Sequence, residues 1–133
     1  MVQNKRRQSE SKLTSTQLEI MNLFWERGEL GVAQVWKLLS ERRRVARNTV
    51  QTMLTRLVEK GWLQARQEGK AFCFRATRLQ KPALQQMVNH LLDSAFGGSA
   101  SGLVMTLLHA RPVSSDEVQR IRELIDQVQE AKK

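Results

Sequence analysis

The segment from Ala46 to Lys60 carries side chains suited to hydrogen bonding with a nucleic acid. Wound into a helix at about 100° per residue, it gathers its apolar residues in one stripe and turns amides, hydroxyls and a guanidinium group outward. These groups bond base edges and phosphates, and threonine adds a methyl group for thymine, whereas an ordinary solvated face would show Glu and Lys pairs. The pattern therefore favours a helix that reads DNA. The stripe consists of Ala46, Val50, Met53, Leu54 and Leu57, and the outward set includes Asn48, Gln51, Thr52, Thr55 and Arg56.

The place of each side chain along this helix predicts its role. Because the first turn of a recognition helix lies deepest in the major groove, we expect its polar residues to approach bases and later ones to hold phosphates. Base contact or close approach to the groove is expected of Arg47, Asn48, Gln51 and Thr52, and phosphate contact of Thr49, Thr55 and Arg56. Further backbone contacts are expected from Arg42, Arg43 and Arg44 before the helix and from Arg66, Lys70 and Arg75 after it. For each arginine alone, plain solvent exposure is an equal alternative.

Other reactive residues are few. Cys73 is the only cysteine and the chain has two histidines, so neither a disulfide framework nor a structural zinc site is expected within one chain. His90, Asp93 and Ser94 are ingredients of hydrolysis, but their spacing sets no base against a nucleophile. The sequence thus predicts no enzyme activity, no metal and no cofactor. Cys73 is expected to be a half-buried strand residue, with a redox sensor as the alternative.

Three tryptophans, Trp25, Trp36 and Trp62, lie in or beside apolar stripes. Their rings could stack on unpaired bases. Packing in the core is the better interpretation, and we expect all three there.

The net charge of +9 is concentrated in one part of the chain. Residues 1–80 hold 16 basic and 7 acidic residues, whereas residues 81–133 hold 6 of each. A basic block followed by a neutral one predicts a domain that binds a polyanion and a second region with another role. A solvated basic surface is the alternative.

Helix signals indicate the elements that position the basic part. Thr14 and Gln17 fit a capping box that opens a first helix, and Gly28 ends it. A second apolar stripe at helical spacing runs from Val32 to Leu39 and precedes the recognition segment, which is expected to be the third helix.

A β-hairpin is expected behind the third helix. Residues 62–66 and 71–75 are strand-like, and Gly69 between them suits a tight turn. Three helices and a hairpin are the order of a winged helix-turn-helix domain, which we place at residues 12–80. Residues 1–11 are polar and basic without periodicity and are expected to form a mobile basic arm.

The remaining residues, 81–133, predict three helices that need a partner. Pro82 suits the first turn of one helix, Pro112 closes a second, and Ser114 with Glu117 caps a third. Helices this short expose more apolar surface than they can hide from one another, so a helical dimerisation domain is expected. Its apolar residues are Leu84, Met87, Val88, Leu91, Leu92, Leu103, Val104, Leu107, Leu108, Val118, Ile121, Leu124, Ile125 and Val128.

Several motifs resemble the penicillinase-repressor family, which includes β-lactamase, methicillin-resistance and copper-responsive repressors. The similarity covers about residues 12–130, and the threonine-rich third helix with its Thr55-Arg56-Leu57 run is the most specific part. The motifs are Leu13-Thr14, Glu19-Ile20-Met21, Leu23-Phe24-Trp25, residues 48–61, Phe96-Gly97-Gly98 and Leu103-Val104.

The resemblance implies a mainly α fold with a small β-hairpin, in which a winged helix precedes a three-helix dimerisation domain. It implies a homodimer that binds an inverted repeat with TACA/TGTA-like half-sites and represses a neighbouring operon, commonly one for a membrane sensor peptidase. Of the recognition residues, Thr49, Thr52, Thr55 and Arg56 match the family pattern, whereas Arg47, Asn48 and Gln51 fall where its members vary.

Two departures bear on how repression would be relieved. The β-lactamase repressors are cut at an Asn-Phe bond, and Thr106-Leu107 stands at the aligned position, which argues against a cut there. Paired cysteines near the C-terminus, as in the copper-responsive branch, are absent from this sequence, which argues against copper sensing by that route.

The sequence therefore predicts a repressor that binds double-stranded operator DNA as a homodimer. A nonspecific or RNA-binding basic winged-helix protein and a regulator that senses a small ligand are the alternatives. Because no segment reaches about 18 uninterrupted apolar residues, we expect no membrane insertion and a cytoplasmic protein.

Overall fold

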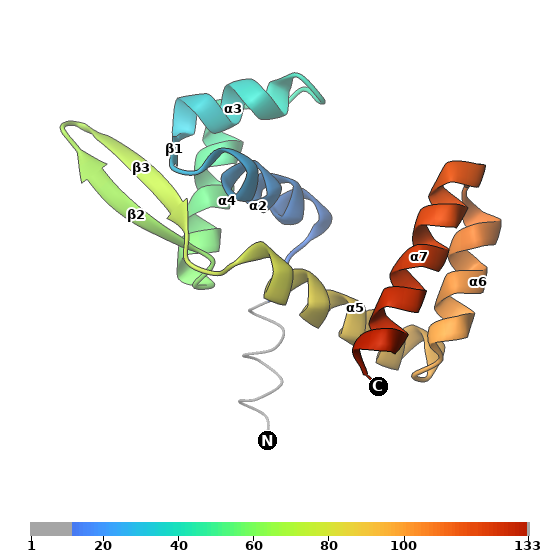
Figure 1. Cartoon of the computed structure of the whole chain (residues 1–133). Helices are drawn as coiled ribbons and strands as arrows, with labels where there is room; N and C mark the ends of the chain where they lie inside the picture. The colour runs from blue at the N-terminus through green and yellow to red at the C-terminus, as the bar shows by residue number, and fades with distance from the viewer. Residues whose placement is uncertain (1–11, 133) are drawn as a thin grey trace. The chain divides into compact units, whose positions relative to one another are not determined.

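The computed structural model describes residues 12–132. Within these residues, six helices and a three-stranded sheet follow one another in the order shown in Figure 1. The predicted mobile arm, residues 1–11, lies outside the described residues. By compactness the chain divides after Gln85 into two units, close to the predicted boundary at residue 80.

The first helix, α2, spans Ser15–Arg27. The predicted capping box is present: the backbone N–H of Gln17 donates to Thr14 Oγ1 at 3.2 Å, and that of Thr14 donates to Gln17 Oε1 at 3.0 Å. Gly28 ends the helix with φ of 86°, a conformation that side chains disfavour. The buried face includes the fully inaccessible Ile20 and Met21.

Helices α3 (Val32–Ser40) and α4 (Arg47–Glu59) form the helix-turn-helix. Most of the predicted apolar stripe faces the core, because Val50, Leu54 and Leu57 are inaccessible to solvent and Met53 is half-buried. Ala46, which the sequence also placed in the stripe, is the exposed N-cap of α4. Val35 and Leu39 of α3 are buried as well. The recognition segment is thus held by its apolar side, which leaves its other faces exposed.

The sheet contains one strand more than the predicted hairpin. β2 (Leu63–Glu68) and β3 (Ala71–Ala76) form that hairpin, with Gly69 in its turn at φ of 63°. A third strand, β1 (Leu30–Gly31), pairs antiparallel with β3 and gives the order β1-β3-β2. The sequence predicted a plain connection between two helices here, because two residues are too short for a period-two pattern.

The tryptophans differ in burial. Trp62 lies in the core at 3% exposure, and Trp25 is half-buried, with its ring 6.5 Å from that of Trp62 in an edge-to-face arrangement. Core packing is wrong for Trp36, which is 39% exposed. Its indole N–H donates to the carbonyl of Val45 at 2.9 Å and so ties α3 to the segment before α4.

The segment that follows the hairpin, which is the wing of the domain, is held against α2 and the core of the first unit. Trp25 Nε1 donates to the carbonyl of Arg78 at 2.8 Å, and the Arg78 guanidinium lies 4.4 Å from the centre of the Trp62 ring. Helix α5 (Gln80–Phe96) begins directly afterwards, and Ala83 near its start is buried. The chain therefore enters α5 from a fixed position on the first unit.

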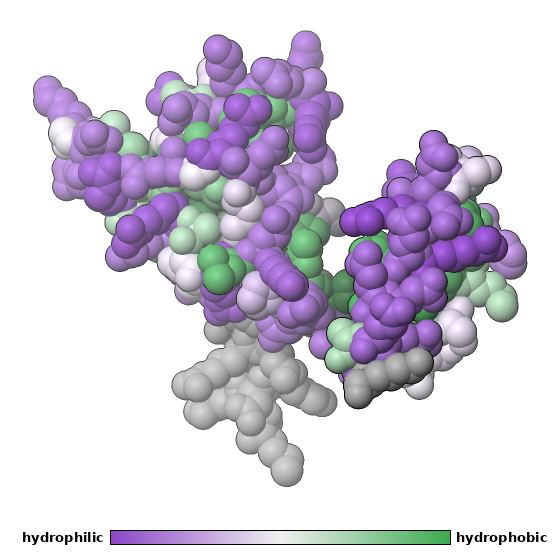
Figure 2. All heavy atoms as spheres, viewed as in Figure 1, coloured by the Kyte–Doolittle hydropathy of each residue, from purple (hydrophilic) through white to green (hydrophobic). Residues whose placement is uncertain are grey.

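The second unit contains the rest of α5 with α6 (Ala100–Ala110) and α7 (Ser115–Ala131). Ser99 and Ser114 cap the two later helices by accepting backbone N–H groups at 3.0 and 3.1 Å. Neither of these helices contains a buried residue. Hydrophilic residues dominate the near face of α7 in Figure 2, with hydrophobic ones along its flank.

In the described part of the chain, a single helix long and apolar enough to cross a membrane is not found. Helices α5 and α6 meet the length and composition only when taken together, and they are bent by 93° at their break.

Candidate nucleic-acid interface

The polar residues predicted on the third helix all lie on the exposed surface of α4. The set is Arg47, Asn48, Thr49, Gln51, Thr52, Thr55 and Arg56. Behind them the apolar stripe packs into the core, so the backbone of α4 is anchored while these side chains are free to meet a ligand. An anchored helix with an exposed polar face is the geometry that readout in a major groove requires.

The threonines of α4 differ in what their hydroxyls can offer. Thr52 Oγ1 donates to the carbonyl of Asn48 at 3.0 Å, and Thr55 Oγ1 donates to that of Gln51 at 2.9 Å. A hydroxyl has a single proton, so in this state these two present an acceptor and a methyl group rather than a donor. Thr49 has no such bond among the described residues, which makes its hydroxyl the better donor to a phosphate.

Some of the predicted basic contacts are already engaged within the domain. Arg43 reaches back to α2, where its Nη2 lies 2.6 Å from a carboxylate oxygen of Glu19. Arg75 donates to Gln64 Oε1 across the hairpin at 2.9 Å. A DNA phosphate would have to compete with these contacts.

Arg66 is engaged more fully than either of them. It forms an ion pair with Glu29, between α2 and β1, and its Nη2 lies 3.5 Å from a carboxylate oxygen of Glu68. The hydrogen bond from Arg66 lowers the pKa of Glu29 and raises that of Arg66. In the register, Arg66 lies opposite Cys73. Paired residues share a face of the sheet, and neighbours along a strand alternate, so Arg66 and Cys73 lie on the face opposite to Phe72 and Phe74.

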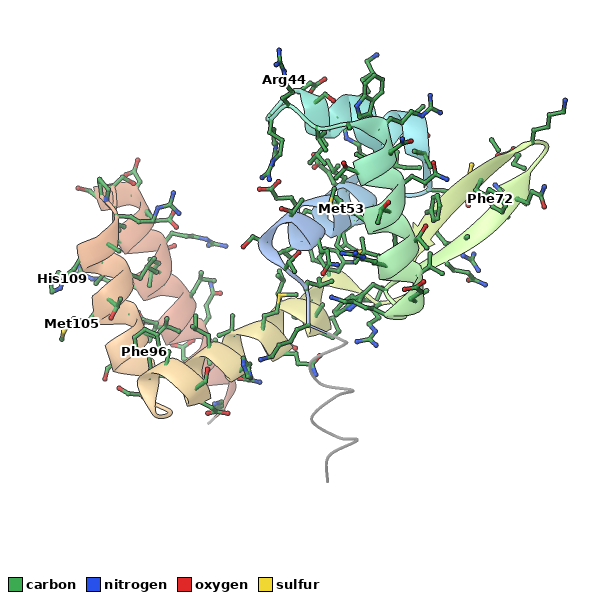
Figure 3. The ribbon with its side chains drawn as sticks, turned by 180° about the vertical axis from the view of Figure 1, so that it is seen from behind. Arg44, Met53, Phe72, Phe96, Met105 and His109 are labelled. Atoms are coloured by element: carbon green, nitrogen blue, oxygen red, sulfur yellow. The ribbon has the colours of Figure 1, made fainter. Side chains whose placement is uncertain are left out.

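The side chains of five predicted basic residues make no hydrogen bond or ion pair with the described part of the chain. They are Arg42, Arg44, Arg47, Arg56 and Lys70. Arg44, labelled in Figure 3, lies on the segment between α3 and α4, and Lys70 lies at the hairpin turn. These cations are not neutralised internally, which makes them better candidates for phosphate contact than Arg43, Arg66 and Arg75.

Cys73 belongs to a small polar cluster on the outer face of the wing. Its Sγ donates to Glu68 Oε2 at 3.3 Å, and this bond, with partial desolvation, raises the pKa of the thiol. One ligand atom from each of Glu29, Glu68 and Cys73 lies within 4.8 Å of the others, a spacing that a metal would accept. Arg66 already pairs with both carboxylates and so offsets one of their two negative charges without an ion. A raised thiol pKa disfavours the reactive thiolate.

A groove of about 600 Å³ lies between α4, the start of α3 and the hairpin. We call it the wing groove. Its wall contains Val58 of α4, Ala65 and Phe72 of the hairpin, and the polar Arg47, Gln51, Thr55 and Lys70. None of the described residues that line it is acidic. The groove therefore joins two sets of predicted contacts, on α4 and on the wing, around a surface that suits an anion.

Sequence reasoning missed two residues of this groove. Phe72 is 50% exposed, although the sequence predicted no more for it than a place in a strand. Gln34 lines the groove near the start of α3, where its Oε1 accepts the backbone N–H of Gly31 at 2.8 Å. The sequence did contain a signal for Phe72. It stands two residues before Phe74, so in a strand the two rings lie on the same face of the sheet.

An anchored, exposed recognition helix beside a basic hairpin defines a winged-helix DNA-binding regulator of transcription. The comparisons with known proteins identify the family. The chain belongs to the penicillinase repressor family, whose model matches residues 13–127, and this is a family of DNA-binding transcriptional repressors rather than enzymes. The resemblance seen in the sequence is thereby confirmed.

Named relatives span nearly the whole chain. The penicillinase repressor of Bacillus licheniformis is 24% identical over 122 residues, which cover 92% of this chain and 95% of that protein. The methicillin resistance regulatory protein MecI of Mammaliicoccus sciuri is 19% identical over 115 residues, covering 86% and 94%. A mutant of MarR from E. coli, solved in complex with operator DNA, shares the fold with a TM-score of 0.52 at 18% identity, covering 94% and 86%.

Proposed function

We propose that the chain binds an inverted-repeat operator as a homodimer, with one α4 helix in each half-site. The exposed amide, hydroxyl and guanidinium face of α4 carries this proposal, because its apolar side is locked in the core. In the proposed arrangement, Asn48 and Gln51 approach bases, and Thr49 and Arg56 hold phosphates. Arg47, which lines the wing groove, contacts a phosphate there. Arg42, Arg44 and Lys70 supply further phosphate contacts that are not neutralised within the described part of the domain.

The second unit, with the preceding turn of α5, is the proposed dimerisation domain. Nine of its predicted interface residues are exposed large hydrophobic side chains, a surface that a second copy would cover. Pairing two weak half-site binders raises the affinity for a double site without new DNA contacts. The nine are Leu84, Val88, Leu91, Val104, Leu107, Leu108, Leu124, Ile125 and Val128.

The cellular setting is also part of the proposal. We propose that the repressor works in the cytoplasm, where operator DNA lies, and that a membrane sensor peptidase relieves repression by acting on the second unit. Thr106 and Leu107 are exposed on α6 but belong to its helix, which a protease would have to open first. Cutting of the full chain during induction, mapped by mass spectrometry, tests the peptidase.

Selection from a random duplex pool tests the DNA-binding proposal. We expect one inverted repeat to be enriched and to outcompete a scrambled duplex at physiological salt. Gln51→Ala should relax the preference at one position of each half-site, whereas Lys70→Ala should weaken all sequences alike. Equal binding to scrambled DNA or to RNA would refute operator recognition and support the nonspecific alternative.

A pair of α7 variants tests the homodimer. Ile125→Asp puts a charge on the apolar flank, and we expect a monomer in analytical ultracentrifugation that still binds a half-site but has lost its advantage on the full repeat. Gln127→Asp adds the same charge at a polar, exposed position of the same helix and should remain dimeric. If wild type sediments as a monomer on and off the repeat, the homodimer is excluded.

A further inference from the structure

Phe72 is a large apolar side chain with half of its surface open to solvent, in the middle of a predicted DNA-binding surface. In the register it lies opposite Gln67, two residue pairs beyond Ala65 and Phe74. Phe74 is buried at 7% exposure, so the core ends between these two rings. Figure 3 shows Phe72 on the wing beside α4. An exposed aromatic ring at such a place suggests contact with a partner.

The surroundings of Phe72 indicate the charge of that partner. Arg47 and Lys70 line the same groove and have no partner within the described chain, and Gln51 adds an amide. Glu29, just before β1, and Glu68 of β2 both pair with Arg66, which alternation places on the opposite face of the sheet. The wing groove thus combines an apolar wall with cationic groups, a combination that fits a chain of alternating sugars and phosphates.

We propose that the wing groove holds one strand of the DNA backbone and that Phe72 packs against a deoxyribose there, which makes Phe72 a determinant of DNA over RNA. This rests on the proposed function. The 2′ position of deoxyribose carries only hydrogen, so it loses little when it is covered by an aromatic ring. A ribose at the same position would bring its 2′-hydroxyl against that ring, where the hydroxyl loses water and gains no hydrogen bond.

The size of the effect follows from the cost of an unsatisfied hydroxyl. A penalty of this kind corresponds to about tenfold in affinity per ribose. Loss of the ring itself should weaken DNA binding by about fivefold, because an apolar contact is removed while every charge remains. The salt dependence should therefore be unchanged in a Phe72 variant.

A ribose scan tests the proposal. The probe is the duplex that the chain selects from a random pool, with single nucleotides replaced in turn by ribonucleotides along one strand. We expect the affinity of the wild-type protein to fall about tenfold when the ribonucleotide stands at one particular position in each half-site. Phe72→Ala should bind the all-DNA probe about fivefold more weakly and should show no ribose penalty at that position. Any effect of the ribose on duplex shape is common to both proteins and cancels in the comparison.

Two variants serve as controls. Phe72→Leu restores an apolar surface and should recover most of the affinity and the ribose penalty, which separates lost contact from a misfolded wing. Lys70→Ala should flatten the salt dependence and keep the penalty. The proposal is overturned if Phe72→Ala retains wild-type affinity, or if the penalty persists without the ring. It is also overturned if a small aromatic anion, rather than DNA, protects Phe72 in the groove. Failure of wild type to select any duplex would instead defeat the proposed function.

Discussion

Arg47, the first residue of α4, and Arg43, four residues before it, give the sharpest test of how this domain uses its charge. Arg47 begins α4 and lines the wing groove without an internal partner in the described chain. Arg43 is bound to Glu19 at 2.6 Å and donates to Thr16 Oγ1 at 3.3 Å. Replacing either by glutamine removes the same formal charge. Any difference between the two variants therefore comes from local structure and not from net charge.

The expected difference can be worked out from the number of contacts. Each lost phosphate contact reduces the slope of log K against log salt by about 0.9. A homodimer on an inverted repeat makes each contact twice, so Arg47→Gln should flatten the slope by about 1.8. Over a fourfold rise in salt, from about 50 to about 200 mM, wild type should then lose about 12-fold more affinity than the variant. Arg43→Gln should leave the slope nearly unchanged and cost under about 1 kcal/mol of stability, as expected for an exposed ion pair.

The assay is fluorescence anisotropy with the selected duplex at five or more salt concentrations, with thermal unfolding measured in parallel. Equal flattening by both variants would show that the pair with Glu19 does not hold Arg43 away from DNA. An unchanged slope in Arg47→Gln would show that Arg47 makes no phosphate contact. Either result would refute the distinction between engaged and free cations.

Three further predictions concern single contacts. Glu68 accepts a hydrogen bond from Cys73 and raises the pKa of the thiol, so iodoacetamide should alkylate Cys73 slowly near pH 8. Glu68→Gln should lower the pKa of the thiol and speed the alkylation, whereas the control Glu59→Gln should leave the rate unchanged. Leu54→Ala should lower the free energy of unfolding, measured in urea, by about 2–5 kcal/mol, because Leu54 is inaccessible to solvent. Met53→Ala should lower it by less, because Met53 is half-buried. Trp25→Phe keeps an aromatic ring but removes the N–H that donates to the Arg78 carbonyl, so the free energy of unfolding should fall by about 0.5–1.5 kcal/mol. An unchanged urea midpoint of unfolding would mean that this hydrogen bond contributes nothing to stability.

The sequence was informative where a local pattern decides the structure. The helical stripe that ends in Leu57 predicted which side of α4 is buried, and the Thr14–Gln17 box predicted the start of α2. The family motifs in the third helix predicted the fold and the class of function, which the comparisons confirm. These features depend on residues close together in the chain, so the sequence alone contains them.

Contacts between distant segments were not predictable in this way. Arg43 pairs with Glu19 and Arg66 with Glu29, 24 and 37 positions away, so the sequence could not distinguish these engaged arginines from the free ones. The exposure of Trp36 and the short strand β1 likewise depend on what packs or pairs across the fold. The roles of individual site residues and the dimerisation surface remain predictions.

The lack of any buried side chain in α6 and α7 has a consequence for the life of the repressor in a cell. If pairing supplies the core of the second unit, its folding and its assembly are one equilibrium, and its stability rises with the number of chains present. Far below the dissociation constant, the amount of paired repressor grows with the square of the total. An unpaired chain exposes loosely held helices to proteases and is removed sooner. The apolar surface of the second unit would then set a concentration of the protein below which too few dimers form for repression.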